Sequence, residues 1–281
     1  MITTILTVIL AIIPGVLYCF FIIRQDKYEK EPKLYLAISL ALGMLVTGVA
    51  YGIEKWADDK MQLYTAAQNI DTYEHFGILM LSAFVITAFT EELLKFLALI
   101  VFAYQRDDFN EPMDGIVYSV MIAMGFATVE NILYTQYGWR TTLIRAFTAV
   151  PAHVVFGIII GYYAGLAKFS KNKQLRYLLT GLFVAVFIHG LYDFFIIQEY
   201  EEWLMIMATA ILVGGLLIAR KFILNHQANS PFKKPNIEME TLTAVSASPE
   251  IETPTVIQEE DNEILDAVLD EMKKENTEEE E

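Results

Sequence analysis

The chain has 281 residues, a mean hydropathy of +0.40 and 55% hydrophobic side chains, and the apolar residues come in blocks about twenty residues long. This pattern excludes an ordinary soluble domain and predicts a polytopic membrane protein. The net charge of −15 belongs mainly to the C-terminal end, where residues 226–281 hold 16 acidic and 4 basic side chains. The acidic tail and scattered bases exclude a nucleic-acid partner, and the single Cys19 provides no disulfide framework.

The predicted fold class is all-α, a polytopic membrane helical bundle of about seven transmembrane helices. A spanning helix needs about 20 mostly apolar residues, and lipid forces such segments to be helical because it offers the backbone no hydrogen-bond partners. The first block lacks a basic region before it and is followed by bases, so we expect a retained helix and not a signal peptide. The seven blocks are residues 2–23, 34–53, 76–104, 115–134, 143–166, 177–197 and 203–222.

The basic residues predict the orientation in the membrane. The connections on one side of the predicted bundle hold 13 Lys and Arg, against 4 on the other side. The positive-inside rule then places the N-terminus outside and the C-terminus in the cytoplasm, in the plasma (cell inner) membrane.

The chain divides into a membrane domain (1–225, with a core at about 76–197) and an acidic, largely disordered tail (226–281). The tail is rich in Ser, Thr, Pro and Glu, a composition that does not form a packed core. Near its end, apolar residues at helical spacing predict a short amphipathic helix at about 262–274. This helix is either a transient element of a solvated tail or a docking site for a cytoplasmic partner.

Ionisable groups inside the predicted spans are costly, at roughly 2.5–3.5 kcal/mol on insertion scales, and are therefore candidates for function. Counted from the cytoplasmic ends of four successive spans, they lie at similar depths, roughly 18–24 Å at about 1.5 Å per residue. Because these residues lie at one depth in the membrane, we expect them to form one site. The candidates are Glu91, Glu92, Lys95, Glu130, Asn131, His153, His189 and Asp193.

Each of these features also has a purely structural explanation. Glu91 and Lys95, four residues apart, could form an intrahelical ion pair, and a lone membrane histidine could simply be a hydrogen-bonded packing residue. Pro151 is expected to kink the helix that carries His153. The repeat of glycines at 157, 161 and 165 predicts a close helix-packing seam.

The motifs resemble the PrsW family of intramembrane proteases, which is related to the type II CAAX prenyl endopeptidases. The resemblance is carried by "EELLK" (91–95), "GFATVEN" (125–131), the histidine of "PAHVVFG" (151–157) and "HGLYD" (189–193), with "RQDKYEKEP" and "EPMDGIVY" in support. It covers about residues 10–200, without the last span or the tail. It implies hydrolysis of a peptide bond in a membrane-protein substrate, such as a single-pass protein. For the member that gives the family its name, the substrate is an anti-sigma factor.

Peptide hydrolysis needs an activated water, a stabilised oxyanion and a proton donor for the leaving amine. We assign Glu91 or Glu92 as the base, with Lys95 holding the other carboxylate ionised. His153 and His189 are expected to polarise the carbonyl or the water. Asn131 and Asp193 are expected to orient them.

The cofactor question stays open between no metal and a zinc ion. His153, His189 and Glu130 could supply two imidazoles and a carboxylate with a water in the fourth position. No His-Glu-x-x-His helix is present, which favours a metal-free glutamate protease.

Two other functions remain in competition. A transporter or proton-coupled carrier could use the same intramembrane Glu, His and Asp residues, but the sequence shows no inverted repeat or paired broken helices. A non-catalytic scaffold of the same fold would be expected to lack the acids of the first motif, and both glutamates are present.

Overall fold

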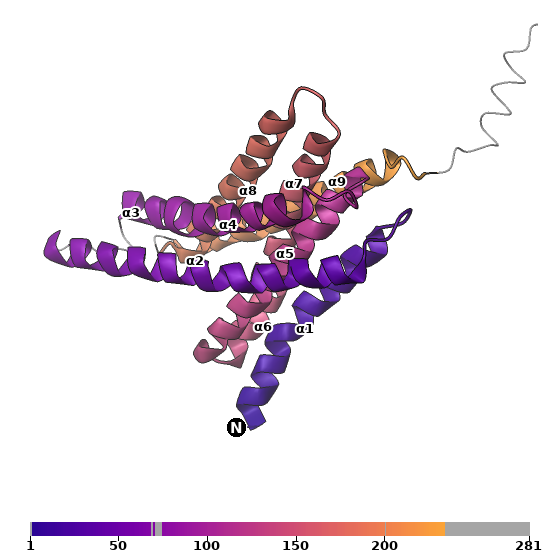
Figure 1. Cartoon of the computed structure of the whole chain (residues 1–281). Coiled ribbons are helices and arrows are strands. Elements are labelled where there is room, and N and C mark those ends of the chain that lie inside the picture. Colours follow the sequence, from indigo (N-terminus) through magenta and orange to yellow (C-terminus); the bar gives the residue numbers. More distant parts are fainter. Residues whose placement is uncertain (1, 69, 71–74, 200, 234–281) are drawn as a thin grey trace, which may run out of the picture. The chain divides into compact units, whose positions relative to one another are not determined.

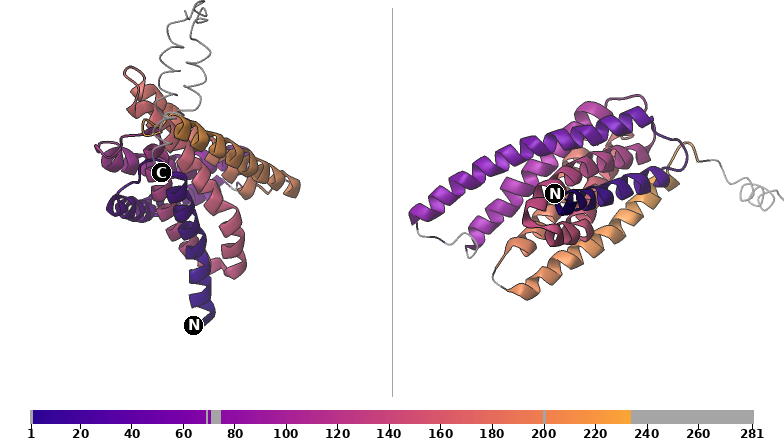
Figure 2. Two further views of the ribbon diagram at one scale, coloured as in Figure 1. Left: turned by 90° about the vertical axis from the view of Figure 1, so that its right-hand side faces the viewer. Right: turned by 90° about the horizontal axis from the view of Figure 1, so that it is seen from below.

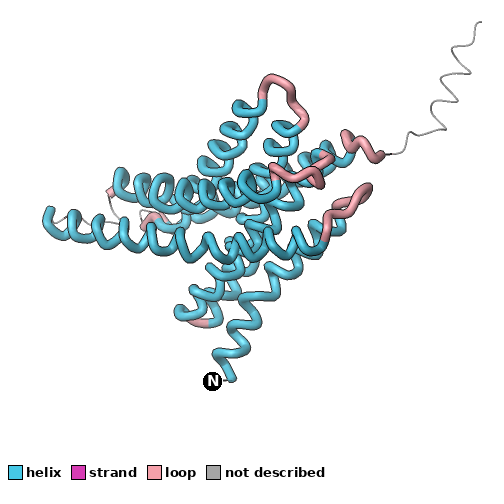
Figure 3. Tube along the Cα trace, in the orientation of Figure 1, coloured by secondary structure: helices cyan, strands magenta, loops and turns pink. Residues whose placement is uncertain are grey.

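The computed structural model of the protein describes residues 2–68, 70, 75–199 and 201–233. Every regular element in these residues is helical and none is a strand (Figure 3), which confirms the all-α class. The predicted tail helix near 262–274 lies outside the described residues. The elements are α1 (Ile2–Gln25), α2 (Lys33–Gln68), α3 (Phe76–Met80), η1 (Leu81–Phe89), α4 (Thr90–Ala98), η2 (Leu99–Ala103), α5 (Pro112–Leu133), η3 (Tyr134–Tyr137), α6 (Trp139–Phe147), α7 (Ala149–Lys168), α8 (Gln174–Ile197), η4 (Glu202–Leu204) and α9 (Met205–Ala228).

Six stretches of the described residues are long and apolar enough to cross a membrane: Thr4–Gln25, Lys33–Gln68, Pro112–Tyr137, Trp139–Lys168, Gln174–Ile197 and Glu202–Ala228. The remaining expected span, residues 76–104, is an unbroken run of α and π turns from α3 to η2. Each piece of this run is shorter than a full span. π turns are frequent at functional sites, and here two of them flank α4, which carries the "EELLK" motif.

Helix α5 forms the core of the bundle, with 17 of its 22 residues buried. It packs against α1, α2 and α7 (Figure 1). Glycines make the close approach possible, because a Cβ on Gly161 of α7 would overlap the backbone carbonyl of Gly115 on α5. On the α2 side, a Cβ on Gly43 would overlap the carbonyl oxygen of Ile122. The predicted glycine seam is therefore confirmed, and α5 is held tightly from two sides.

Two flanks complete the bundle around this core. Helix α2 also contacts α4, and α9 contacts α7 and α8. Figure 2, seen from below, shows α2 and α9 on opposite sides of the group that contains α5 and α6. The chain from α3 to α4 therefore lies along the α2 flank.

The predicted span 143–166 is divided into two helices, whereas the sequence predicted one helix with a kink. Helix α6 ends at Phe147 and α7 begins at Ala149, and Thr148 between them has φ −122° and ψ −71°. Pro151 lies in the first turn of α7, where its missing N–H breaks no intrahelical bond. The proline thus marks the start of a new helix, and α6 is free to turn back toward the end of α5.

Candidate active site

Lys95 is the centre of a buried polar cluster. Its Nζ donates hydrogen bonds to Glu91 Oε2 at 2.8 Å, to Glu92 Oε1 at 2.9 Å and to His153 Nδ1 at 3.0 Å. An ammonium group has three donors, so all of them are used. The ammonium also lies 3.8 Å from the ring centroid of Phe126, in cation–π geometry. Positions three and four residues apart on α4 thus place both glutamates within reach of one lysine.

The Lys95 contact fixes the tautomer of His153. Because Nδ1 accepts a hydrogen bond from the ammonium, the ring proton is assigned to Nε2, which donates to Glu130 Oε2 at 2.8 Å. The other oxygen of Glu130 pairs with Arg145 Nη2 at 2.6 Å. A continuous chain of polar contacts therefore joins α4, α7, α5 and α6.

His189 on α8 lies between two carboxylates. Its Nδ1 is 2.9 Å from Glu92 Oε1, and its Nε2 is 3.2 Å from Asp193 Oδ2. The ring of Phe156 stacks on it with centroids 4.4 Å apart and an interplanar angle of 16°. These contacts hold the imidazole in one orientation, with a fixed direction for each ring nitrogen.

The cluster is closed on one side and partly open on the other. Glu92 is completely buried and Lys95 is 4% exposed, whereas Glu130 and Asp193 are 17% and 23% exposed. Arg145 lies at the same open edge, 16% exposed. Glu130, Arg145 and Asp193 therefore form the partly exposed edge of the cluster, while the α4 carboxylates lie at the closed end.

Asn131 does not join this cluster. Its Nδ2 donates to the backbone oxygen of Ala11 on α1 at 3.1 Å. Neighbouring residues on a helix point about 100° apart, so when Glu130 faces the cluster Asn131 faces α1. The other seven predicted residues are brought together by direct contacts.

Two members of the site were missed in the sequence. Arg145 was counted as a base outside the membrane because it lies near the start of a predicted span. Glu54 lies one residue beyond the predicted end of its span, yet α2 continues to Gln68. Its Oε1 is buried without a hydrogen-bond partner among the described residues, and the charges of Glu91 and Glu130 act on it. No signal in the local composition distinguished either residue from the other charged residues near the predicted span ends.

Two groups of side chains in this cluster could hold a metal ion. Ligand atoms lie within 4.8 Å of one another in the group Glu91, Glu130 and His153, and in the group Glu91, Glu92 and His189. The predicted set of His153, His189 and Glu130 is not one of the groups found among the described residues.

Both groups contain carboxylates and an imidazole, which are common zinc ligands. The second group, Glu91, Glu92 and His189, fits zinc better. Glu92 Oε2 is a buried atom without a partner among the described residues, and Asp193 faces the far nitrogen of His189 as a supporting carboxylate does in metal sites. Lys95 donates to members of both groups, so the unpartnered oxygen of Glu92 is the feature that favours the second group.

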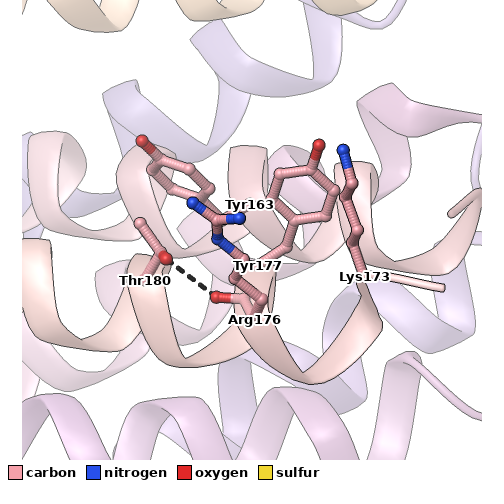
Figure 4. Close-up of a pocket in the computed structure, with 5 residues that line it drawn as sticks. All are labelled: Tyr163, Lys173, Arg176, Tyr177 and Thr180. Atoms are coloured by element: carbon pink, nitrogen blue, oxygen red, sulfur yellow. Dashed lines mark hydrogen bonds between the residues drawn. The ribbon is translucent and has the colours of Figure 1, made fainter.

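A pocket elsewhere in the structure has different chemistry. It lies where α7 and α8 connect and is lined by Tyr163, Lys173, Arg176, Tyr177 and Thr180 (Figure 4). The hydroxyl of Thr180 donates to the backbone oxygen of Arg176 at 2.7 Å. Tyrosines and bases are typical of a membrane boundary, and none of these five residues belongs to the buried cluster.

Apolar helices of membrane-spanning length surround a buried cluster of carboxylates, imidazoles and one ammonium group, an arrangement that fits a membrane-embedded hydrolase as well as the carrier considered above. The chain belongs to the PrsW family: the model of the "PrsW family intramembrane metalloprotease" matches residues 31–220. The match reaches well into α9, so the sequence-based limit near residue 200 was too short. Family membership makes the protein a multi-pass intramembrane protease and decides against the carrier and scaffold functions.

Curated relatives agree with the family match. The chain is 35% identical to Protease PrsW of Geobacillus kaustophilus over 191 residues, 68% of this chain and 79% of the relative. It is 32% identical to Protease PrsW of Clostridioides difficile over 212 residues, 73% and 85% of the two chains. For Protease PrsW of Bacillus subtilis the identity is 32% over 202 residues, 70% and 84%. No solved structure matches the chain.

Proposed function

We propose that Glu92 is the general base of peptide-bond hydrolysis. The single observation that carries this assignment is the difference between its two oxygens. Oε1 accepts hydrogen bonds from Lys95 and faces His189, whereas Oε2 is buried and has no partner among the described residues. Glu92 is therefore a carboxylate with a fixed orientation and one oxygen free to bind water.

The reaction then consists of two proton transfers, the formation of one bond and the cleavage of another. Glu92 Oε2 removes a proton from the bound water, and the water oxygen forms a bond to the carbonyl carbon of the substrate. The imidazoles of His153 and His189, whose ring centroids are 5.5 Å apart, stabilise the oxyanion once their N–H groups turn from Glu130 and Asp193 to the substrate oxygen. The C–N bond breaks, and the proton held by Glu92 passes to the leaving nitrogen. Lys95 keeps Glu91 and Glu92 in place throughout.

A zinc-dependent form of the same site is favoured by two observations. The family is described as metalloproteases, and the cluster carries an excess of acid. Among the described residues, the carboxylates of Glu91, Glu92, Glu130 and Asp193 face the cations of Lys95 and Arg145, an excess of two acids. Glu91, Glu92 and His189 would hold the metal, which supplies Lewis-acid polarisation of the carbonyl and a more acidic water. Glu92 is then a ligand, and the base is another carboxylate of the cluster.

The substrate class follows from the position of the site. A cluster closed at α4 and surrounded by apolar helices suits a substrate that is itself in the membrane, such as a single-pass protein. We extend the proposal to regulated cleavage of an anti-sigma factor in the plasma membrane. The N-terminus would lie outside, and the acidic tail would be free to bind a cytoplasmic partner.

The test is cleavage of a single-pass reporter protein by the purified full chain in liposomes. Glu92→Gln should lower the rate by about 10²–10⁴-fold, the usual contribution of a general base. Glu202→Gln, which changes an exposed carboxylate, should cleave at the unaltered rate. Wild-type cleavage by Glu92→Gln would refute both forms of the proposal.

Elemental analysis separates the two forms. If the protein is dialysed against a chelator and still cleaves while holding no metal, Glu92 acts as the base without zinc. If zinc and activity disappear together, return with zinc alone, and the zinc content is low in His189→Ala, the metal form is correct.

A further inference from the structure

A second group of carboxylates lies outside the active site, where the connection after α1 meets the start of α5. Asp26, Glu29 and Glu31 come from "RQDKYEKEP", and Glu111 and Asp114 come from "NEPMDG". Asp26, Glu111 and Asp114 are at most 1% exposed. Among the described residues, the hydrogen bonds of the cluster around Lys95 involve none of these five carboxylates.

The carboxylates converge on a small volume. One ligand atom each of Asp26, Glu111 and Asp114 lies within 4.8 Å of the others, and the same is true of Glu29, Glu31 and Asp114. Asp114 belongs to both sets and is held by its backbone contacts, because its Oδ2 accepts hydrogen bonds from the amides of residues 110 and 111, each at 2.8 Å. Its Oδ1 has no partner among the described residues.

The group is strongly acidic, and Lys30, whose charge acts on Asp26, forms no ion pair with it in the described residues. Within the described residues, none of the five carboxylates takes part in an ion pair. Lys30, in the same connection, donates instead to the backbone oxygen of Ile23 at 2.8 Å. Buried side-chain oxygens without a hydrogen-bond partner among the described residues in this part of the structure include Asp26 Oδ1, Glu29 Oε2, Glu31 Oε1 and Asp114 Oδ1, while the Glu111 side chain accepts from the backbone N–H of Asp114 in a capping box.

Burial of several carboxylates without compensation is strongly unfavourable. Burial, together with the neighbouring Glu111 and Asp114 charges, raises the pKa of Asp26 to about 7. Mg²⁺ and Ca²⁺ prefer oxygen ligands such as unpartnered carboxylates that face inward. Softer metals prefer imidazole and thiolate, and the two ligand groups found here among the described residues contain neither. A cation would supply the charge and satisfy the oxygens together.

We propose that Asp26, Glu111 and Asp114, flanked by Glu29 and Glu31, bind a hard divalent cation of the Mg²⁺ or Ca²⁺ class. The cation joins the end of α1 to the first turn of α5, the buried helix that carries Glu130. Its role is structural, since the group touches none of the reacting side chains. The site is independent of the zinc question, because it uses only oxygen ligands from other elements.

Thermal unfolding of the purified full chain in detergent tests the proposal. After treatment with EDTA, addition of Mg²⁺ or Ca²⁺ alone should raise the Tm by about 5–10 °C, the shift expected at about 100 times the Kd. Glu111→Gln and Asp26→Asn should abolish this rise. Asp107→Asn, which changes an exposed acid in the neighbouring connection, should retain it.

A direct binding assay covers the case in which these variants fail to fold. Tb³⁺ added to the wild-type protein should emit under tyrosine excitation, because the hydroxyl of Tyr118 donates to Glu31 Oε2 in this group. Ca²⁺ should displace the emission, and Glu92→Gln should leave it unchanged. If neither cation raises the wild-type Tm and no Tb³⁺ emission occurs, protons neutralise the group and the proposal is wrong.

Discussion

Replacement of Lys95 by methionine measures how much the buried cluster depends on one ammonium group. The side chains are similar in length and apolar volume, so Lys95→Met mainly removes charge and three donors. Glu91 Oε2, Glu92 Oε1 and His153 Nδ1 then lose their shared partner. Two carboxylates are left buried without a nearby cation.

The expected magnitude follows from this burial. Removal of one partner from a buried pair costs about 3–5 kcal/mol, because the remaining charge stays desolvated. At about 2–4 °C per kcal/mol for a domain of this size, the Tm should fall by about 6–20 °C. The triple variant with Glu91→Gln and Glu92→Gln removes the unpaired charges as well and should regain most of the loss.

Thermal unfolding of the purified variants in one detergent provides the assay. The control is Lys55→Met, since Lys55 also pairs with an acid four residues away, Asp59, but at 4.0 Å and with both side chains 62% exposed. Exposed pairs contribute at most about 1 kcal/mol, so the control should shift the Tm by less than about 4 °C. An equal effect of Lys95→Met and Lys55→Met would show that Lys95 does not hold the cluster together.

Three further predictions concern stability and activity. Gly161→Ala should lower the Tm by several degrees because its methyl group overlaps the α5 backbone, whereas Gly48→Ala, which meets nothing within 4 Å, should raise it slightly; equal shifts would contradict the seam. Glu54→Gln should leave the Tm unchanged or raise it, because one oxygen of Glu54 is buried without a hydrogen-bond partner among the described residues and no ion pair is lost; a large fall would mean that Glu54 has a cationic partner. Arg145→Met should reduce reporter cleavage at least tenfold by releasing Glu130, while Arg145→Lys should keep part of the rate, and full activity in Arg145→Met would separate this pair from catalysis.

The sequence was sufficient to find most of the buried cluster. Charged residues in apolar spans are expensive, so Glu91, Glu92 and Lys95 were conspicuous, and four-residue spacing indicated which of them share a face. The packing role of the glycine repeat was also readable, because small residues at that spacing have few other uses in membrane helices. The catalytic roles of these residues stay predictions.

Other parts of the site depend on contacts that hydropathy does not contain. Arg145 belongs to the site only because α6 breaks from α7 at Thr148 and turns back toward Glu130; Pro151 indicated a distortion here but not the direction that the chain would take. Glu54 was lost at a predicted span end because α2 continues as a helix well past its apolar part. Asn131 was misplaced for the opposite reason, since adjacency in sequence does not mean adjacency around a helix.

The buried charged residues meet their partners at different times during synthesis on the ribosome. Glu91, Glu92 and Lys95 emerge within five residues of one another and can neutralise one another as soon as that turn coils. Glu130 emerges earlier than both of its partners and enters the translocon alone. Until residues 145–153 have been synthesised, Glu130 lacks the two side chains, Arg145 and His153, that it contacts in the folded chain.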